Sequence, residues 1–281
     1  MPDSPATTFL TLDSGIRFAL HDLGGSGRPV LICHATGFCG RAYEPLARAL
    51  GDRFHLWALD MPGHGDSDNP SGEDFSWRAM VGHVVAATRA IGDESLACVV
   101  GHSMGGAVAL QAAADHPVLF DAAYLYEPII VPPADVTRRT GPNPMADGAR
   151  RRQGTFASKE AALWRYASRP PLAELSAGSL AAYVEHGFAE NSDGTASLKC
   201  TPENEARTFE SSASITTESV ALATLPTLVV TGANSALASM GPPVVAALPN
   251  AQLRTHRHLG HFGPLQGPEA IADEIAAHIT R

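Results

Sequence analysis

Ser103 carries the sharpest chemical signal in this 281-residue sequence, because it stands at the centre of Gly101-His102-Ser103-Met104-Gly105, a G-x-S-x-G pattern. A short apolar run precedes the pattern and a segment of small, helix-forming residues follows it. Glycine two positions before and two positions after the serine lets a strand and a helix pass closely. A serine on such a turn projects its hydroxyl above the sheet, near the positive end of the helix. The pattern therefore predicts a nucleophile rather than a simple helix cap.

A general base for this serine is expected in "THRHLGHFGP", which contains His256, His258 and His261. A neutral imidazole with a pKa near ~6.5 can take the serine proton and return it to a leaving group. His256 and His258 alternate along an expected strand, so both should lie on one face as structural or surface residues. His261 follows Gly260 in the loop beyond that strand. His102 is interpreted as a packing residue.

Four segments, in order along the chain, resemble those of a known family. They are "CHATGFCG" at 33–40, "LDMPGHGDSD" at 59–68, "GHSMGG" at 101–106 and "LGHFGPLQGPE" at 259–269. Together they resemble the α/β-hydrolase superfamily over nearly the whole chain. The resemblance implies an oxyanion loop, a further loop after the fourth strand, a nucleophile elbow and a catalytic histidine, whose position His261 matches. It says much less about the substrate.

The oxyanion that develops during acyl transfer needs two hydrogen-bond donors. One is expected to be the backbone N–H of Met104, the residue after the nucleophile. By resemblance, the second comes from the loop after the third strand, where we assign it to the N–H of Thr36. The family usually has glycine where this chain has Ala35. His34 is expected to orient this loop through hydrogen bonds, and His64 to brace the next one.

The acid that orients the histidine is not where most members of the superfamily have it. There it lies about three residues past a glycine after the seventh strand, and counting from Gly232 gives Ser235. No Asp or Glu occurs anywhere from 219 to 268, although 29 of the 281 residues are acidic. A serine cannot carry the charge that an imidazolium requires. Ser235 and Asn234 are therefore interpreted as loop residues beside His261.

In some haloalkane dehalogenases and in zearalenone-type lactonases, the acid stands instead at the end of the sixth strand. Glu127 occupies the corresponding place here, at the carboxyl end of an apolar run that Pro128 stops. A rim glutamate in contact with water is the alternative interpretation. Because the seventh-strand acid is missing, we expect Glu127 to be the orienting acid.

The elements that position these residues follow from short, nearly continuous apolar runs separated by helical spacing. Such runs are typical of strands buried on both faces of a parallel sheet. The expected strands are 28–34, 53–60, 96–102, 121–127, 225–232 and 251–260, after a hairpin formed by 7–12 and 16–22. The expected helices are 43–50, 76–91, 104–116 and 268–279. This alternation predicts an α/β protein with a mostly parallel sheet flanked by helices. The resemblance implies that this architecture is the α/β-hydrolase fold.

The alternation is interrupted after the sixth strand, where the superfamily commonly inserts a helical cap. We expect a core formed by 1–132 and 219–281 and a cap, or lid, formed by 133–218, with helices near 158–168 and 178–188 and no convincing strand. The basic run 148–153, "GARRRQ", is interpreted as a solvated helix face. The residues proposed to contact substrate are Phe38, Trp164, Tyr183 and His186, with Tyr166 and Phe188 as further candidates.

The charge balance limits the partners. A formal net charge of −9 argues against nucleic acid and anionic membranes, both of which need clustered Lys and Arg. No apolar run approaches the ~20 residues that cross a bilayer, and the first residues do not resemble a secretory signal. The four cysteines are scattered and lack zinc-site spacing, so free thiols in a reducing cytoplasm are expected, with no metal and no organic cofactor. A homodimer is left open.

The predicted function is hydrolysis of a carboxylic ester or lactone through Ser103, His261 and Glu127, with an acyl-enzyme intermediate. Carbon–carbon bond hydrolysis and cofactor-free perhydrolysis use the same triad and stay open, as does a ligand receptor with little turnover. Dehalogenase and epoxide-hydrolase chemistry is disfavoured, because those members use Asp as the nucleophile.

Overall fold

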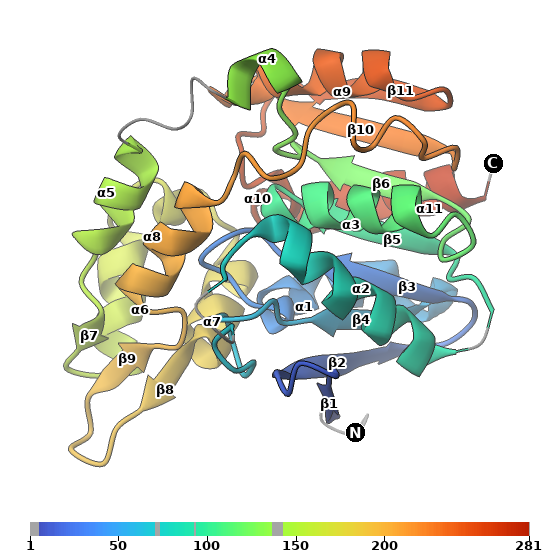
Figure 1. Cartoon of the computed structure of the whole chain (residues 1–281). Helices are drawn as coiled ribbons and strands as arrows, with labels where there is room; N and C mark the ends of the chain where they lie inside the picture. Colours follow the sequence, from blue (N-terminus) through green and yellow to red (C-terminus); the bar gives the residue numbers. More distant parts are fainter. Residues whose placement is uncertain (1–5, 71–73, 93, 137–142, 281) are drawn as a thin grey trace.

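The computed structural model describes residues 6–70, 74–92, 94–136 and 143–280, and these form an eight-stranded sheet of order β1-β2-β4-β3-β5-β6-β10-β11 (Figure 1). The strands are β1 Thr7–Thr11, β2 Arg17–Gly25, β3 Pro29–Cys33, β4 His55–Leu59, β5 Cys98–His102, β6 Ala123–Tyr126, β10 Thr227–Gly232 and β11 Ala251–His256. The first three strands in this order pair antiparallel, and the remaining neighbours pair parallel. The predicted α/β class with a mostly parallel sheet is confirmed.

Helices cover both faces of this sheet because the central strands are apolar on both sides. In β3, Val30 and Ile32 belong to one buried cluster, while Leu31 and Cys33 belong to the other, as strand alternation requires. The first cluster is closed by α1 Glu44–Leu50 and α11 Pro268–Ile279, and the second by α2 Trp77–Ile91, α3 Met104–Asp115 and α9 Gly241–Ala247. The helices predicted at 43–50, 76–91, 104–116 and 268–279 are therefore confirmed within one residue at each end.

The segment between β6 and β10, which we call the insert (residues 133–218), lies at one end of the strands (Figure 1). Val131 forms a bridge with Thr216 where the chain leaves the sheet and returns to it. The described part of the insert contains α4 Pro133–Val136, α5 Pro144–Arg150, α6 Lys159–Ala167, α7 Ala177–Gly187 and α8 Pro202–Glu210. Ser158, Ser176 and Thr201 cap the last three of these helices by accepting hydrogen bonds from backbone N–H groups.

The expectation of no strand in the insert was wrong. Three short strands, β7 Thr155–Phe156, β8 Phe188–Glu190 and β9 Ala196–Leu198, form an antiparallel sheet of order β7-β9-β8. Each strand has only two or three residues. Such short strands show no alternation that a sequence pattern could reveal.

No helix in the described ranges is long and apolar enough to cross a membrane. One further short helix, α10 Gly263–Gln266, follows β11 and precedes α11. It therefore lies directly after the predicted catalytic loop.

Candidate active site

Ser103 forms a sharp turn between β5 and α3. Its backbone has φ 55° and ψ −116°, a left-handed region that a residue with a side chain rarely adopts. Its N–H donates to the carbonyl of Tyr126 in the neighbouring strand at 3.0 Å, which helps to hold the turn. A Cβ on Gly101 would lie 2.5 Å from the Gly106 Cα, and a Cβ on Gly105 would lie 2.2 Å from the Cys33 carbonyl oxygen. The glycines of the motif are thus required by the close approach that the sequence predicted.

A cavity of about 740 Å³ opens over this turn, between the sheet and the insert. Its volume is within the ~300–1,000 Å³ of pockets that enclose a small organic molecule. Ser103 and His261 both line it, as do Thr36, Phe38 and Tyr183. The cavity therefore brings together the predicted nucleophile, the predicted base and the predicted oxyanion loop.

His261 and Glu127 form a short contact, with 2.6 Å between His261 Nδ1 and Glu127 Oε2. The glutamate is fully buried, has φ 43°, and also accepts hydrogen bonds from the Gly232 N–H at 2.9 Å and the Ser235 hydroxyl at 2.6 Å. The hydrogen bonds from these three donors replace the hydration that a carboxylate loses on burial. Glu127 thus reaches from the end of β6 across the end of β10, where it supports the imidazole.

Ser235, at the place where most of the superfamily has its acid, donates to Glu127 rather than replacing it. Its hydroxyl also accepts the Leu237 N–H at 3.0 Å, which fixes its orientation. The Asn234 N–H donates to the carbonyl of Leu259 and so ties this loop to the one before His261. We expected Ser235 only as a loop residue, and its contact with the carboxylate is a finding of the structure.

The loop after β3 is held by buried hydrogen bonds. His34 Nδ1 donates to the carbonyl of Ala35 at 2.8 Å, and His34 Nε2 accepts the Met61 N–H at 2.9 Å. Burial lowers the pKa of His34, in agreement with the neutral ring that this donor and acceptor pattern requires. These are the orienting bonds that we expected of His34.

Thr36 and Met104 are the residues whose amides are proposed to bind an oxyanion beside this cavity. Thr36 lines it, and Met104 is the first residue of α3, whose amide has no acceptor within its own helix. The backbone hydrogen bonds between the described elements use neither amide. Within the described residues, both amides are therefore without a backbone acceptor.

The fold is matched by a family model described as "alpha/beta hydrolase fold", which covers residues 28–268. The chain belongs to this family. Among solved structures it resembles E-2-(acetamidomethylene)succinate hydrolase, with a TM-score of 0.78, 22% identity, and coverage of 98% of this chain and 100% of that one. At this identity the likeness concerns the fold alone.

Two curated relatives match over shorter stretches. The magnesium-chelatase 30 kDa subunit of Rhodobacter capsulatus is 34% identical over 98 residues, which are 34% of this chain and 34% of that protein. The pimeloyl-[acyl-carrier protein] methyl ester esterase of Xanthomonas campestris pv. campestris is 35% identical over 96 residues, 34% of this chain and 35% of that protein. The chain thus matches about a third of the length of these two relatives.

His102 has a role that the sequence did not reveal. Its Nε2 lies 2.8 Å from the carbonyl oxygen of His261. Because a carbonyl oxygen can only accept a hydrogen bond, His102 Nε2 must carry the hydrogen. Its Nδ1 then accepts from the Tyr43 hydroxyl at 2.6 Å, and that hydroxyl oxygen accepts the Ala35 N–H at 3.2 Å. Burial first, and the nearby His261 second, lower the pKa of His102 well below its usual value. A neutral, buried chain of hydrogen bonds therefore joins the loop after β3 to the loop that contains His261.

Two of the four residues expected to contact substrate do not line the cavity. Trp164 is 71% exposed, and His186 lies 3.3 Å from Glu44 at the start of α1. On α6, Trp164 is two residues beyond the buried Ala162, and at ~100° per residue it faces the opposite side. The expectation for Trp164 and His186 is corrected accordingly, whereas Phe38 and Tyr183 line the cavity with ring centroids 4.8 Å apart.

The basic run at 148–153 was also misjudged, because Arg152 points inward. It forms an ion pair of 2.5 Å with Glu205 and donates to the hydroxyls of Tyr166 and Tyr183 at 3.1 and 3.0 Å. Arg152 and Glu205 both line the cavity. A run of three arginines gives no sign of which one turns inward, so only the packing of α5 against α8 shows it.

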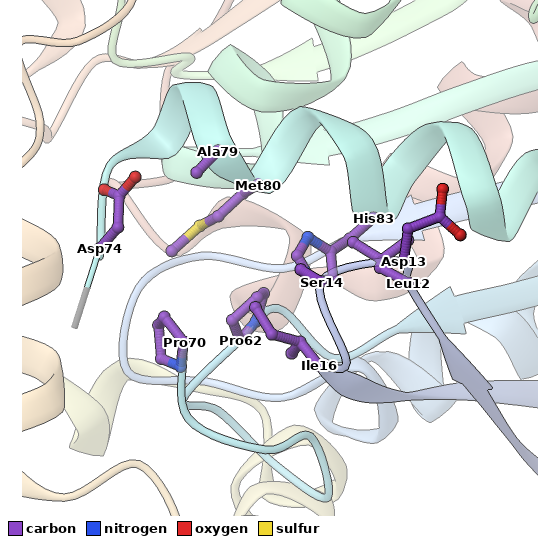
Figure 2. Close-up of a pocket in the computed structure, with 10 residues that line it drawn as sticks. All are labelled: Leu12, Asp13, Ser14, Ile16, Pro62, Pro70, Asp74, Ala79, Met80 and His83. Atoms are coloured by element: carbon purple, nitrogen blue, oxygen red, sulfur yellow. The ribbon is translucent and has the colours of Figure 1, made fainter. Parts of the chain in front are cut away.

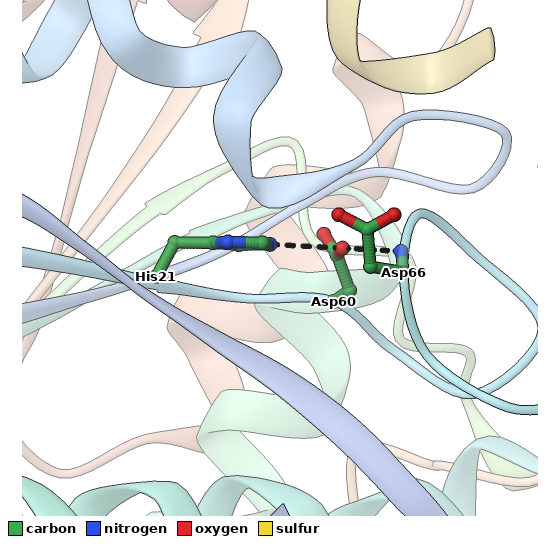
Figure 3. Close-up of side chains that lie close together, drawn as sticks. All are labelled: His21, Asp60 and Asp66. Carbon is green, nitrogen blue, oxygen red and sulfur yellow. Dashed lines mark hydrogen bonds and ion pairs between the residues drawn. The ribbon is translucent and has the colours of Figure 1, made fainter. Parts of the chain in front are cut away.

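His21, Asp60 and Asp66 are close enough together to be considered as ligands of a metal ion (Figure 3). Protein donors already occupy the oxygens of Asp60: His21 Nε2 at 2.9 Å, the Gly40 N–H at 2.6 Å and the Asp66 N–H at 2.8 Å. Burial alone would raise the pKa of Asp60, but these hydrogen bonds, led by that of His21, outweigh it and lower the pKa. The cluster is a brace that joins β2, the oxyanion loop and the loop after β4.

A second cavity, of about 440 Å³, lies between the β1–β2 turn and the start of α2 (Figure 2). Leu12, Ile16 and Met80 give it an apolar wall, and His83 points toward it. Burial lowers the pKa of His83 to about 4, so the ring is neutral near pH 7. Ser103, Glu127 and His261 do not line this cavity.

Proposed function

We propose that this protein is a serine hydrolase of carboxylic esters that acts through Ser103, His261 and Glu127. The observation that carries the proposal is the 2.6 Å contact between His261 and Glu127 at the wall of the cavity that Ser103 also lines. An imidazole fixed at Nδ1 by a buried carboxylate presents its other nitrogen as a base.

In the proposed reaction, His261 Nε2 takes the proton of the Ser103 hydroxyl while the serine oxygen attacks the ester carbonyl. The amides of Met104 and Thr36 donate to the oxyanion of the tetrahedral intermediate. The protonated His261, stabilised by Glu127, gives its proton to the leaving alcohol, which leaves an acyl-serine. Water then attacks the acyl-serine with His261 as base, and the acid and free Ser103 are released.

The insert is proposed to act as a cap, because residues from α5, α6, α7 and α8 form much of the cavity wall. A cap limits the access of water and selects the substrate. The likeness to a pimeloyl-[acyl-carrier protein] methyl ester esterase supports an ester as the substrate. A lactone, which is a cyclic ester, is the nearest alternative substrate.

The test is a panel of short and long acyl esters and lactones, together with labelling by a fluorophosphonate. Wild type should be labelled and should turn over at least one ester, while Ser103→Ala should lose both properties. Ser212→Ala, which removes another hydroxyl from the cavity wall, is the matched control and should keep them. Absence of labelling in the folded wild type would refute the proposal, and labelling without turnover would favour a receptor.

A further inference from the structure

The wall of the active-site cavity is positively charged, although the chain as a whole carries −9. Arg152, Arg165 and Arg169 line the cavity, and Glu205 is the one acid among the described lining residues. Because Glu205 is paired with Arg152, Arg165 and Arg169 are left without an acidic partner among the described lining residues.

Arg165 and Arg169 lie at the C-terminal end of α6 and just beyond it. Within the described ranges, neither guanidinium group has an ion pair or a side-chain hydrogen bond. Arg165 stands in the last turn of α6, Arg169 lies two residues past its end, and both residues are exposed at the cavity. Since cations at a helix C-terminus are favourable, the helix accounts for one arginine, but not for two unpaired ones at the cavity.

The three arginines also differ in what holds them. Arg152 is fixed by Glu205 and by two tyrosine hydroxyls, so its donors are largely used. Arg165 and Arg169 keep their donors available for a ligand. A guanidinium group matches the geometry of a carboxylate, to which it can donate two parallel hydrogen bonds.

We propose that the substrate is an ester that carries a carboxylate on its acyl chain, and that Arg165 and Arg169 bind this carboxylate while the ester carbonyl lies at Ser103. The chain between the two groups contacts the apolar part of the wall, which includes Phe38, Leu172 and Phe262. The inference rests on the proposed function and adds the substrate class to it.

Matched esters test the proposal by catalysis. The 4-nitrophenyl monoester of adipic acid and 4-nitrophenyl hexanoate have acyl chains of the same length and differ in the terminal carboxylate. In the Arg165→Gln/Arg169→Gln variant, kcat/KM for the adipate ester should fall about 10- to 100-fold, the size expected when charge-assisted hydrogen bonds are lost. Activity on hexanoate should stay within about twofold, which also shows that the variant is folded. Arg151→Gln, which removes an exposed arginine that does not line the cavity, should change neither activity.

Binding of adipate itself, measured by calorimetry, tests the same contact without turnover. Wild type and Arg151→Gln should bind adipate, the double glutamine variant should bind it about 10- to 100-fold more weakly, and Arg165→Lys/Arg169→Lys should recover part of the loss. Equal binding by wild type and the double glutamine variant would overturn the inference, even if ester hydrolysis is found. Tighter binding of hexyl phosphate than of adipate would overturn the assignment of a carboxylate. Loss of labelling at Ser103 with adipate binding intact would instead contradict only the proposed reaction.

Discussion

His261–Glu127 and His21–Asp60 are both pairs of an imidazole and a buried carboxylate, but they lie in different surroundings. The contacts are 2.6 and 2.9 Å long, and both carboxylates are almost fully buried. In the second pair, His21 is fully buried and its other nitrogen contacts the Thr7 hydroxyl at 2.9 Å. In the first, the His261 side chain is 21% exposed at the cavity, and its second nitrogen has no hydrogen-bond partner in the part of the chain that the structure describes.

The difference shows that a histidine–carboxylate pair is not by itself a catalytic unit. When both ring nitrogens are engaged inside the protein, the pair only holds elements together. When one nitrogen faces a cavity next to a nucleophile, the same pair can move a proton. A substitution in the His261–Glu127 pair should therefore lower activity, whereas a substitution in the His21–Asp60 pair should lower stability.

The largest effect is expected for Glu127→Gln. It keeps the size of the side chain but removes the charge that stabilises the imidazolium, so kcat should fall on the order of 10³- to 10⁴-fold. Ester turnover measures this, and fluorophosphonate labelling should slow in parallel. Asp135→Asn changes an acid eight residues further along the chain and is the control. Near-full activity of Glu127→Gln would remove this residue from the triad.

Asp60→Asn should act on stability instead. Leaving a buried hydrogen-bond donor without its acceptor commonly costs about 1–3 kcal/mol in the free energy of unfolding, and Asp60 Oδ2 accepts from both His21 and the Asp66 N–H. Urea denaturation should show this loss, and the remaining folded protein should keep its kcat. If Asp60→Asn lowers kcat as strongly as Glu127→Gln while leaving the urea midpoint unchanged, the brace interpretation fails.

His83 is a third case, a buried histidine without a bonded carboxylate, and it predicts a pH dependence. Its pKa is about 4 in the folded protein and near ~6.5 when exposed, so the unfolded state binds more protons between these values. Its contribution to stability is therefore complete above pH ~6.5 and is lost as the pH falls toward 4. Urea midpoints from pH 7 to pH 4 should decline less steeply in His83→Gln than in wild type. Parallel curves would show that His83 does not titrate in this way.

A moderate effect is expected for Tyr43→Phe, which cuts the chain of hydrogen bonds between the oxyanion loop and His261. We expect kcat to fall by about tenfold, the equivalent of one hydrogen bond, with KM little changed. Tyr124→Phe is the matched control, because its buried hydroxyl donates to Glu274 at 2.7 Å and does not line the cavity. Equal losses of kcat in the two variants would indicate a general loss of packing rather than positioning.

The smallest effect is expected for Trp164→Ala. Because this side chain is 71% exposed and does not line the cavity, kcat/KM should stay within about twofold of wild type. Tyr183→Ala, at a buried ring of the cavity wall, should change it more. A larger effect of Trp164→Ala would restore this residue to the substrate site.

Much of the core could be predicted from the sequence because its signals are local. The expected helix at 76–91 is observed as Trp77–Ile91, and the expected strand at 96–102 as Cys98–His102. The turn at Ser103 was predictable for the same reason, since Gly101 and Gly105 leave room that no other residue leaves. In the insert, strands of two or three residues gave no pattern. The sequence also did not show that Trp164 lies on the exposed side of α6 and Tyr183 on the buried side of α7.

The sequence by itself determined the order of the core elements, the serine turn and the absence of an acid after β10, because each of these depends on residues close together in the chain. Only the tertiary structure decided that Glu127 reaches across β10 to His261 and Ser235, that His102 joins two loops, and that His21–Asp60 is a closed brace. These pairings join residues up to 159 positions apart. Their partners are chosen by how the strands lie side by side, and residue type alone does not contain that information.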